Sequence, residues 1–145
     1  MEKVAVKKLR PGAVMPKFGS KAAAGADLYA CLEESVTIAP GQTVFIPPGL
    51  AMALPRGYVG LVYARSGLAC KQDLAPANKV GVIDSDYRGE IMVGLQNSGK
   101  EDYVIQPADR IAQLMIAPVI QAQVELVDEL DETARGAGGF GSTGA

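Results

Sequence analysis

The sequence contains no histidine, so imidazole can act neither as a general base nor as a metal ligand. It has only two cysteines, Cys31 and Cys70, which form no C-x-x-C pair and have no histidine to join them in a zinc site. Buried, reduced thiols are the prediction for both. No apolar run approaches the roughly 20 residues of a membrane span, and none of signal-peptide length follows the N-terminal lysines. We therefore expect a soluble, cytoplasmic protein.

Net charge is also nearly absent. The 145 residues include 14 Lys and Arg against 16 Asp and Glu, a net charge of −2. This balance argues against general attraction to nucleic acid or to an anionic membrane, so any anion must be held by a local cluster. The length is typical of one domain, and the hydrophobic content of 48% is sufficient for its core.

Glycine and proline, with 17 and 9 residues, fall at short intervals between apolar or alternating runs. Such spacing predicts an all-β sandwich or barrel. The expected strands include residues 43–46, 51–54, 58–63, 90–93 and a long last strand at 119–127. At most one short helix is expected, over residues 65–71, with Ser66 as its cap and with amide groups that favour an anion.

The segment 135–145 is rich in glycine and carries a single aromatic residue, Phe140. It cannot offset its own ordering entropy, so it is expected to be flexible when the protein is alone. Two interpretations remain: a disordered terminus, which composition alone favours, or a flap that becomes ordered on a ligand. The chain is accordingly divided into a β domain, 1–134, and a C-terminal segment, 135–145, which is the flap of the second interpretation.

Three carboxylates crowd the stretch GVIDSDYRGEI at residues 81–91. Asp84, Asp86 and Gly89 match positions one, three and six of a calcium loop, but Arg88 falls at position five and Leu95 at position twelve, which excludes a cation loop. What remains is a solvated hairpin or a carboxylate that acts as a base in place of histidine.

Five blocks resemble, in order, the five motifs of the trimeric dUTP pyrophosphatases (dUTPases): AGADLYA at 24–30, RSGLA at 65–69, the stretch 81–91, RIAQL at 110–114 and RGAGGFGSTG at 135–144. Ala64 and Ala108 depart from a proline and a glycine that are common in the family, and neither change removes a reactive group. The related dCTP deaminases carry a glutamate where this chain has Arg88. A noncatalytic nucleotide-binding protein on the same scaffold would be expected to lack Asp84 or the tail.

The resemblance implies a jelly-roll-like β subunit of a homotrimer with three active sites, each built from all three chains. It implies hydrolysis of dUTP to dUMP and pyrophosphate, which limits uracil in DNA and supplies dUMP for thymidylate synthesis. Mg²⁺ is the implied cofactor, held by the substrate phosphates and water without a direct protein ligand. No nucleic-acid or membrane partner is expected.

Residue by residue, the resemblance makes Asp84 the general base that activates water at the α-phosphorus. Base and sugar contacts fall to Asn78, Gly81, Tyr87 and Phe140, with Tyr87 against the deoxyribose. The phosphate-binding residues are Arg65, Ser66, Gly67, Gln113, Arg135, Gly138, Ser142 and Thr143. Asp27 and Arg110 support this polar network. In the stretch 81–91, Asp86 is expected to shape the turn and Glu90 to face water.

Overall fold

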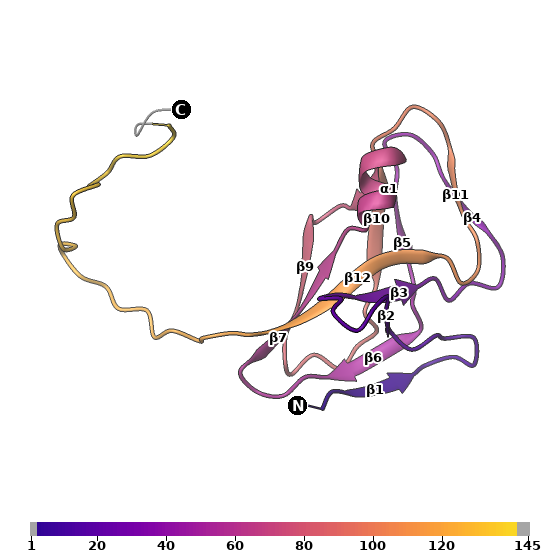
Figure 1. Cartoon of the computed structure of the whole chain (residues 1–145), viewed down its shortest axis with the longest axis horizontal. Helices are drawn as coiled ribbons and strands as arrows, with labels where there is room; N and C mark the ends of the chain where they lie inside the picture. Colours follow the sequence, from indigo (N-terminus) through magenta and orange to yellow (C-terminus); the bar gives the residue numbers. More distant parts are fainter. Residues whose placement is uncertain (1–2, 142–145) are drawn as a thin grey trace.

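The computed structural model describes residues 3–141, and its body consists almost entirely of short antiparallel strands (Figure 1). In chain order the elements are β1 (Ala5–Lys8), β2 (Lys17–Phe18), β3 (Ala26–Tyr29), β4 (Val36–Ile38), β5 (Thr43–Ile46), β6 (Leu50–Ala53), β7 (Tyr58–Tyr63), α1 (Ser66–Lys71), β8 (Leu74–Pro76), β9 (Val80–Ile83), β10 (Val93–Asn97), β11 (Tyr103–Ile105) and β12 (Arg110–Pro118). The predicted all-β fold with one short helix is confirmed.

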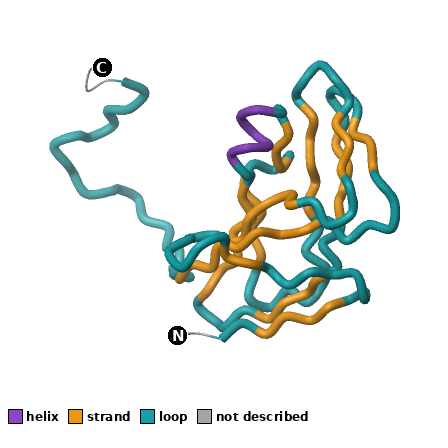
Figure 2. Tube along the Cα trace, turned by 45° about the vertical axis from the view of Figure 1, so that its right-hand side comes forward, coloured by secondary structure: helices purple, strands orange, loops and turns teal. Residues whose placement is uncertain are grey.

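The strands form four small antiparallel sheets that enclose one core (Figure 2). The largest has the order β2-β3-β12-β7-β9, and the others are β5-β10-β8, β1-β6 and β11-β4. Burial alternates along β3, β7 and β10, as expected for strands with one face on a core. All four sheets contribute to a single hydrophobic cluster, which includes Leu28, Ile38, Leu50, Leu95 and Leu114.

The predicted strands at 43–46 and 58–63 coincide with β5 and β7, and 51–54 lies within one residue of β6. The strand predicted at 90–93 is wrong, because β10 begins only at Val93. Ile91 is buried, and its amide donates to Leu50 O at 3.0 Å, outside any ladder. Its apolar character reflects a buried anchor at the end of a loop.

The long strand predicted at 119–127 is also wrong. The last strand of the body is β12, and the chain then leaves the body as an extended arm, residues 119–134 (Figure 1). Val119 N donates to Gly57 O at 2.8 Å, whereas the backbone hydrogen bonds seen in residues 120–141 are local. Apolar side chains in the arm are left exposed, with Val124 at 93% and Leu126 at 97%. The composition is that of a strand, but the described part of the chain provides no partner strand.

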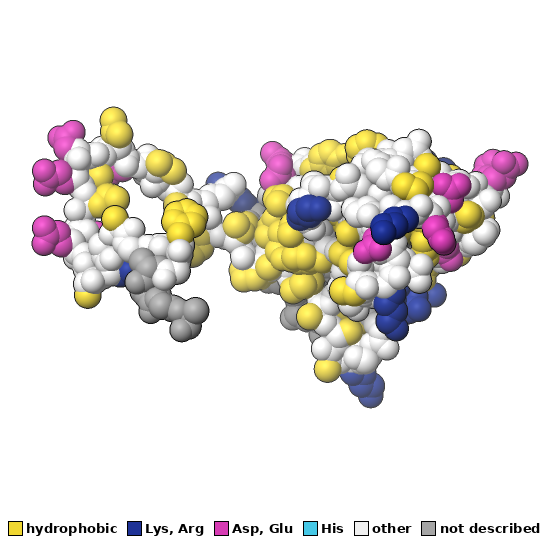
Figure 3. All heavy atoms as spheres, turned by 90° about the horizontal axis from the view of Figure 1, so that it is seen from above, with side chains coloured by type: hydrophobic (Ala, Val, Ile, Leu, Met, Phe, Trp, Pro, Cys, Tyr) yellow, Lys and Arg dark blue, Asp and Glu magenta, His cyan; other side chains and the backbone are white. Residues whose placement is uncertain are grey.

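Figure 3 shows the arm and tail apart from the body, and hydrophobic side chains cover the side of the body nearest to them. Neither the arm nor the described tail therefore shapes the core. No helix formed by residues 3–141 is long and apolar enough to cross a membrane.

Helix α1 lies where a helix was predicted, but Ser66 does not cap it. Arg65, with extended backbone, occupies the N-cap position and makes no side-chain cap bond, and Ser66 is the first helical residue. The helix buries none of its residues, so Cys70 is exposed and the prediction of a buried thiol is wrong there. Cys31 is half-buried, and both thiols are free.

Candidate active site

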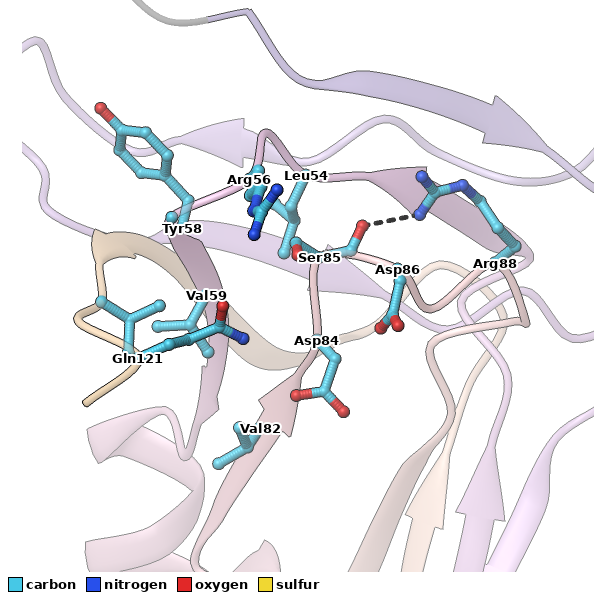
Figure 4. Close-up of a pocket in the computed structure, with 12 residues that line it drawn as sticks. Leu54, Arg56, Tyr58, Val59, Val82, Asp84, Ser85, Asp86, Arg88 and Gln121 are labelled. Carbon is cyan, nitrogen blue, oxygen red and sulfur yellow. Dashed lines mark hydrogen bonds between the residues drawn. The ribbon is translucent and has the colours of Figure 1, made fainter. Parts of the chain in front are cut away.

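The turn 84–91, which joins β9 to β10, borders an open cavity with a volume of about 760 Å³ (Figure 4). Both Asp84 and Asp86 line this cavity from exposed positions, so Asp86, predicted to shape the turn, also faces it. Arg88 folds back onto the turn, where Nη1 donates to Ser85 O at 2.8 Å and to Tyr87 O at 3.0 Å. The guanidinium therefore fastens the backbone of the turn and leaves the carboxylates accessible.

Two smaller hollows lie along β9 beside the large cavity. One, of about 180 Å³, is lined by Asp84 and Tyr87, and the other, of about 90 Å³, by Asn78 and Gly81. They adjoin, because Val82, Ile83 and Met92 line both. The structure thus brings Asn78, Gly81, Asp84 and Tyr87 to one continuous surface, which runs from the β8–β9 turn to the β9–β10 turn.

Gly81 gives this surface a point of close backbone approach. A Cβ at this position would lie 3.2 Å from Val62 Cβ and 3.5 Å from Asn78 Nδ2. Any side chain would therefore press on Val62 of β7 and would come into contact with the Asn78 amide. With glycine, the backbone of β9 stays open to a ligand beside Asn78.

Tyr87 is held by the end of its own turn. Its hydroxyl donates to Glu90 O at 2.9 Å. Gly89 lies directly beneath the ring, since a Cβ there would be 2.6 Å from Tyr87 Cζ. The ring is 44% exposed, so one part rests on the turn and the rest borders the hollow.

Glu90 does not face water as predicted. Its side chain is only 20% exposed, and Oε1 accepts the Gly49 amide at 2.8 Å and pairs with Arg10 Nη2. The Cys31 side chain and, to a smaller degree, Glu90 raise the pKa of Arg10, which therefore stays protonated. The prediction is wrong because Glu90 meets partners 41 and 80 residues away, which local alternation of polar and apolar residues cannot reveal.

A second polar cluster lies across the centre of the large sheet. Asp27 Oδ1 accepts Arg65 Nε at 2.8 Å, and Asp27 Oδ2 pairs with Arg110 Nη1 at 3.4 Å. One carboxylate thus holds two arginines, which leaves a net positive cluster. Arg65 and Arg110 line a hollow of about 210 Å³. The exposed Ser66 and Gly67 follow Arg65 in the first turn of α1.

Gln113 belongs to the same cluster. In the register of the sheet it faces Asp27 on β3 and Tyr63 on β7, and its Nε2 donates to Ala64 O at 2.8 Å. A Cβ at Gly25 would come within 2.8 Å of Gln113 Oε1, so the glycine makes room for the amide. Among the predicted phosphate-binding residues, the structure brings Arg65 and Gln113 together with Asp27 and Arg110.

The two clusters lie at opposite ends of the β7–β9 pair. Tyr63 pairs with Val80 and Gly60 with Ile83, so Arg65 follows β7 at one end and Asp84 follows β9 at the other. At a rise of about 3.3 Å per residue, the separation is roughly 20 Å. One chain therefore does not bring Asp84 and Arg65 into contact.

The predicted residues of the tail form a third group. Arg135 Nε donates to Gly138 O at 2.8 Å, and Gly138 N donates to Arg135 O at 3.1 Å, which closes a local turn. Phe140 is fully exposed, with φ at 52°. Ser142 and Thr143 lie outside the described residues. Across residues 3–141, no three or more Asp, Glu or Cys side chains gather closely enough to hold a metal ion.

Comparison with known proteins decides the family. The dUTPase family model matches residues 12–144. The chain belongs to the dUTPase family. The deoxyuridine 5'-triphosphate nucleotidohydrolase of Desulfitobacterium hafniense is 56% identical over 131 residues, which cover 90% of this chain and 87% of that dUTPase. The nucleotidohydrolase of the same name from Syntrophotalea carbinolica is 50% identical over 141 residues, 97% of this chain and 96% of the relative.

Solved dUTPase structures share the fold. The dUTPase of Staphylococcus bacteriophage 80alpha with dUPNHPP superposes with a TM-score of 0.92, at 29% identity and over 100% of both chains. A mutant dUTPase of Staphylococcus aureus phage phi11, described with a structural Mg(II) ion, has a TM-score of 0.82 at 26% identity, over 90% of this chain and 100% of its own. The expected jelly-roll-like dUTPase fold is confirmed.

Proposed function

We propose that this member of the dUTPase family hydrolyses dUTP to dUMP and pyrophosphate, with Asp84 as the general base. The observation that carries the proposal is the continuous surface along β9, where Asn78, Gly81 and Tyr87 lead to an exposed carboxylate. Relatives named for this activity, at 50% identity or more, support it. In the cell the reaction would limit uracil in DNA and supply dUMP for thymidylate synthesis.

The nucleoside would lie along β9. Backbone groups near Gly81 and the Asn78 amide would bond the edge of uracil, where cytosine presents a donor in place of an acceptor. Such a buried mismatch rejects an analogue strongly. Tyr87 would pack against the deoxyribose and leave no room for a 2′-hydroxyl. Phe140 of the tail would cover the base.

The triphosphate would be bound by the positive cluster and the tail. Arg65 would offer its guanidinium, with Asp27 and Arg110 as its support, and Ser66, Gly67 and Gln113 would add hydrogen bonds. In the tail, Arg135, Gly138, Ser142 and Thr143 would close on the outer phosphates. Closure would exclude bulk water and strengthen these interactions.

Asp84 would perform the proton transfer. An aspartate carboxylate is ionised at neutral pH and can polarise a water molecule held in line with the α-phosphorus. The water oxygen forms a bond to phosphorus, its proton passes to Asp84, and the bond from the α-phosphorus to the bridging oxygen breaks. Pyrophosphate leaves with that oxygen. Positioning and charge neutralisation are the main demands of such a reaction.

Mg²⁺ is the proposed cofactor, held by the phosphates and water. This mode is typical of Mg²⁺, which keeps several waters and binds substrate phosphates with few protein ligands. When bound, the ion supplies neutralisation of phosphate charge. Gln113 would lie near the α-phosphate.

We further propose a homotrimer in which each site takes residues from three chains. The separation of roughly 20 Å between Asp84 and Arg65 supports this, since a triphosphate bound to one chain could not meet both. The arm, with its exposed Val124 and Leu126, and the detached tail are consistent with contacts to other copies. A cytoplasmic location is part of the proposal, because dUTP does not cross membranes unaided.

Product analysis with the purified protein and Mg²⁺ tests the function. Release of dUMP and pyrophosphate from dUTP is expected, with little turnover of dCTP or UTP. Ammonia from dCTP would instead support a deaminase. Tight nucleotide binding without any product would support a noncatalytic binding protein.

A further inference from the structure

Glu90 connects the turn 84–91 to the rest of the body through its side chain and holds Tyr87 through its backbone. We propose that Arg10 and Glu90 are a positioning pair that fixes this turn for catalysis and sugar selection. The inference rests on the proposed function, because its readout is turnover of dUTP.

The contacts of Glu90 reach in two directions. Its Oε1 accepts the Gly49 amide at 2.8 Å and pairs with Arg10. Its carbonyl oxygen accepts the Tyr87 hydroxyl at 2.9 Å and the Met92 amide at 3.0 Å. A shift of Glu90 would therefore be passed directly to the Tyr87 ring.

The other side of the anchor is closely packed at Gly49. This residue has φ at 70°, and a Cβ there would lie 2.9 Å from both Ala13 Cβ and Cys31 Sγ. Leu9 N donates to Gly49 O at 2.8 Å, which connects the segment before Arg10 to the same glycine. The Gly49 amide is thus presented to Glu90 from a packed turn, and Arg10 from the segment bonded to it.

Main-chain contacts hold the two ends of the turn. Ile83, at the end of β9, pairs with Gly60 of β7, and the amide of the buried Ile91 donates to Leu50 O at 3.0 Å beside Glu90. Residues 84–89, between these ends, are exposed or half-exposed and project from the body. The carboxylate of Glu90 thus adds a side-chain anchor immediately after the part of the turn that carries Asp84 and Tyr87.

The two partners of Glu90 contribute unequally. Arg10 is 43% exposed, and exposed ion pairs contribute little because water screens them. The Gly49 amide is part-buried, and such a donor is costly to leave without an acceptor. Loss of the carboxylate oxygen should therefore have a larger effect than loss of Arg10.

Four variants of the full chain separate these contacts. Glu90→Ala removes the carboxylate that accepts from both Arg10 and the Gly49 amide. Glu90→Gln keeps an oxygen for the Gly49 amide but loses the negative charge. Arg10→Ala removes only the cation, and Arg10→Lys restores it. Lys8→Ala and Glu34→Gln are the controls, since both residues are exposed and lie outside the sites described.

For dUTP, we expect kcat to fall roughly 100-fold in Glu90→Ala and about tenfold in Glu90→Gln and Arg10→Ala, because displacement by about 1 Å is costly to catalysis. KM should change little, since the positive cluster is distant. The preference for dUTP over UTP should decrease most in Glu90→Ala and less in Glu90→Gln and Arg10→Ala, as kcat does. Arg10→Lys should recover most of the loss, and both controls should match the wild type.

Folding is checked by circular dichroism and thermal unfolding, and if Glu90→Ala does not fold, the other three variants carry the test. Folded variants with wild-type kcat and an unchanged preference for dUTP over UTP would contradict the positioning role of Arg10 and Glu90. A lowered Tm with unaltered kinetics would overturn it too, because the contact would then be structural only. An inactive wild type would overturn both the proposed function and the positioning role of Arg10 and Glu90. An active wild type with unaffected variants would overturn the positioning role alone.

Discussion

The ring of Tyr87 rests on Gly89, so closely that a Cβ at position 89 would lie 2.6 Å from Tyr87 Cζ. A methyl group at position 89 would require the hydroxyl end of the ring to move. The Tyr87 hydroxyl also donates to Glu90 O at 2.9 Å, so the move would break this hydrogen bond. The selection proposed for deoxyribose therefore depends on a residue that would not itself contact the sugar.

Gly89→Ala should displace the Tyr87 ring. We expect a narrower preference for dUTP over UTP and little change in the free energy of unfolding, because the Tyr87 ring is 44% exposed and can swing aside. Parallel kinetics with both nucleotides and thermal unfolding measure the two effects. Gly19→Ala is the matched control, since a Cβ at Gly19 meets nothing within 4 Å. An unaltered preference for dUTP over UTP in Gly89→Ala would contradict the role of Gly89 in positioning the Tyr87 ring.

Deletion of residues 135–145 should abolish most turnover and leave the fold intact. The described tail residues make only local hydrogen bonds, so their removal costs the body no contact. Thermal unfolding should give the same Tm, and turnover of dUTP should fall by at least 100-fold because the phosphates and base are left open. Full activity of the shortened chain would mean that the tail is not a flap.

The arm should be needed for assembly. The double substitution Val124→Ser with Leu126→Ser changes two side chains that are exposed in the single chain, so it should not alter a monomer. In the proposed trimer these side chains would be covered, each contributing about 1.5–3 kcal/mol. Light scattering should give three times the 15.1 kDa chain mass for the wild type and a lower mass for the variant.

Asp128→Ser, in the same arm, is the control for this experiment. It removes a charge from an exposed position without removing apolar surface. A wild-type mass equal to that of one chain would contradict the trimer, whatever the variants do.

Asp27→Asn should weaken the positive cluster. The amide puts an NH₂ donor in place of one carboxylate oxygen, so one of the two arginines faces a donor instead of its acceptor, and the two guanidinium groups lose the charge that neutralises them. We expect KM for dUTP to rise about tenfold and the free energy of unfolding to fall by about 1–3 kcal/mol. Asp109→Asn, beside Arg110, serves as a comparison. An unchanged KM would count against a role of the cluster in phosphate binding.

Composition and spacing predicted a polar turn with a possible base at residues 81–91, because Asp84, Tyr87 and Gly89 stand close together in the sequence. The resemblance to the dUTPases selected Asp84 as the predicted base. Sequence reasoning did not find the pairing of Glu90 with Arg10, 80 residues away, since neither residue has a local signal of its partner. The helix after Arg65 was predicted from its turn residues, yet the role of Ser66 as a cap was wrong.

The main error in the predicted fold was the strand expected at residues 119–127, which belong to the arm. Residues 119–127 have the alternating apolar character of a strand, and propensity is the only information that composition carries. A strand also needs a partner for its backbone, and β12 already lies between β3 and β7 in the large sheet. What such a segment pairs with depends on the whole assembly and cannot be read from one chain.

The central claim is that Asp84 is the base, and the most direct test compares Asp84→Asn with Asp86→Asn, since both carboxylates line the same cavity. Turnover of dUTP and affinity for a nonhydrolysable dUTP analogue are measured for each. The account predicts that Asp84→Asn binds the analogue like the wild type but loses turnover by a factor of about 10²–10⁴, the contribution of a general base, whereas Asp86→Asn keeps most activity. Near-normal turnover in Asp84→Asn, or an equal loss in both variants, would contradict it.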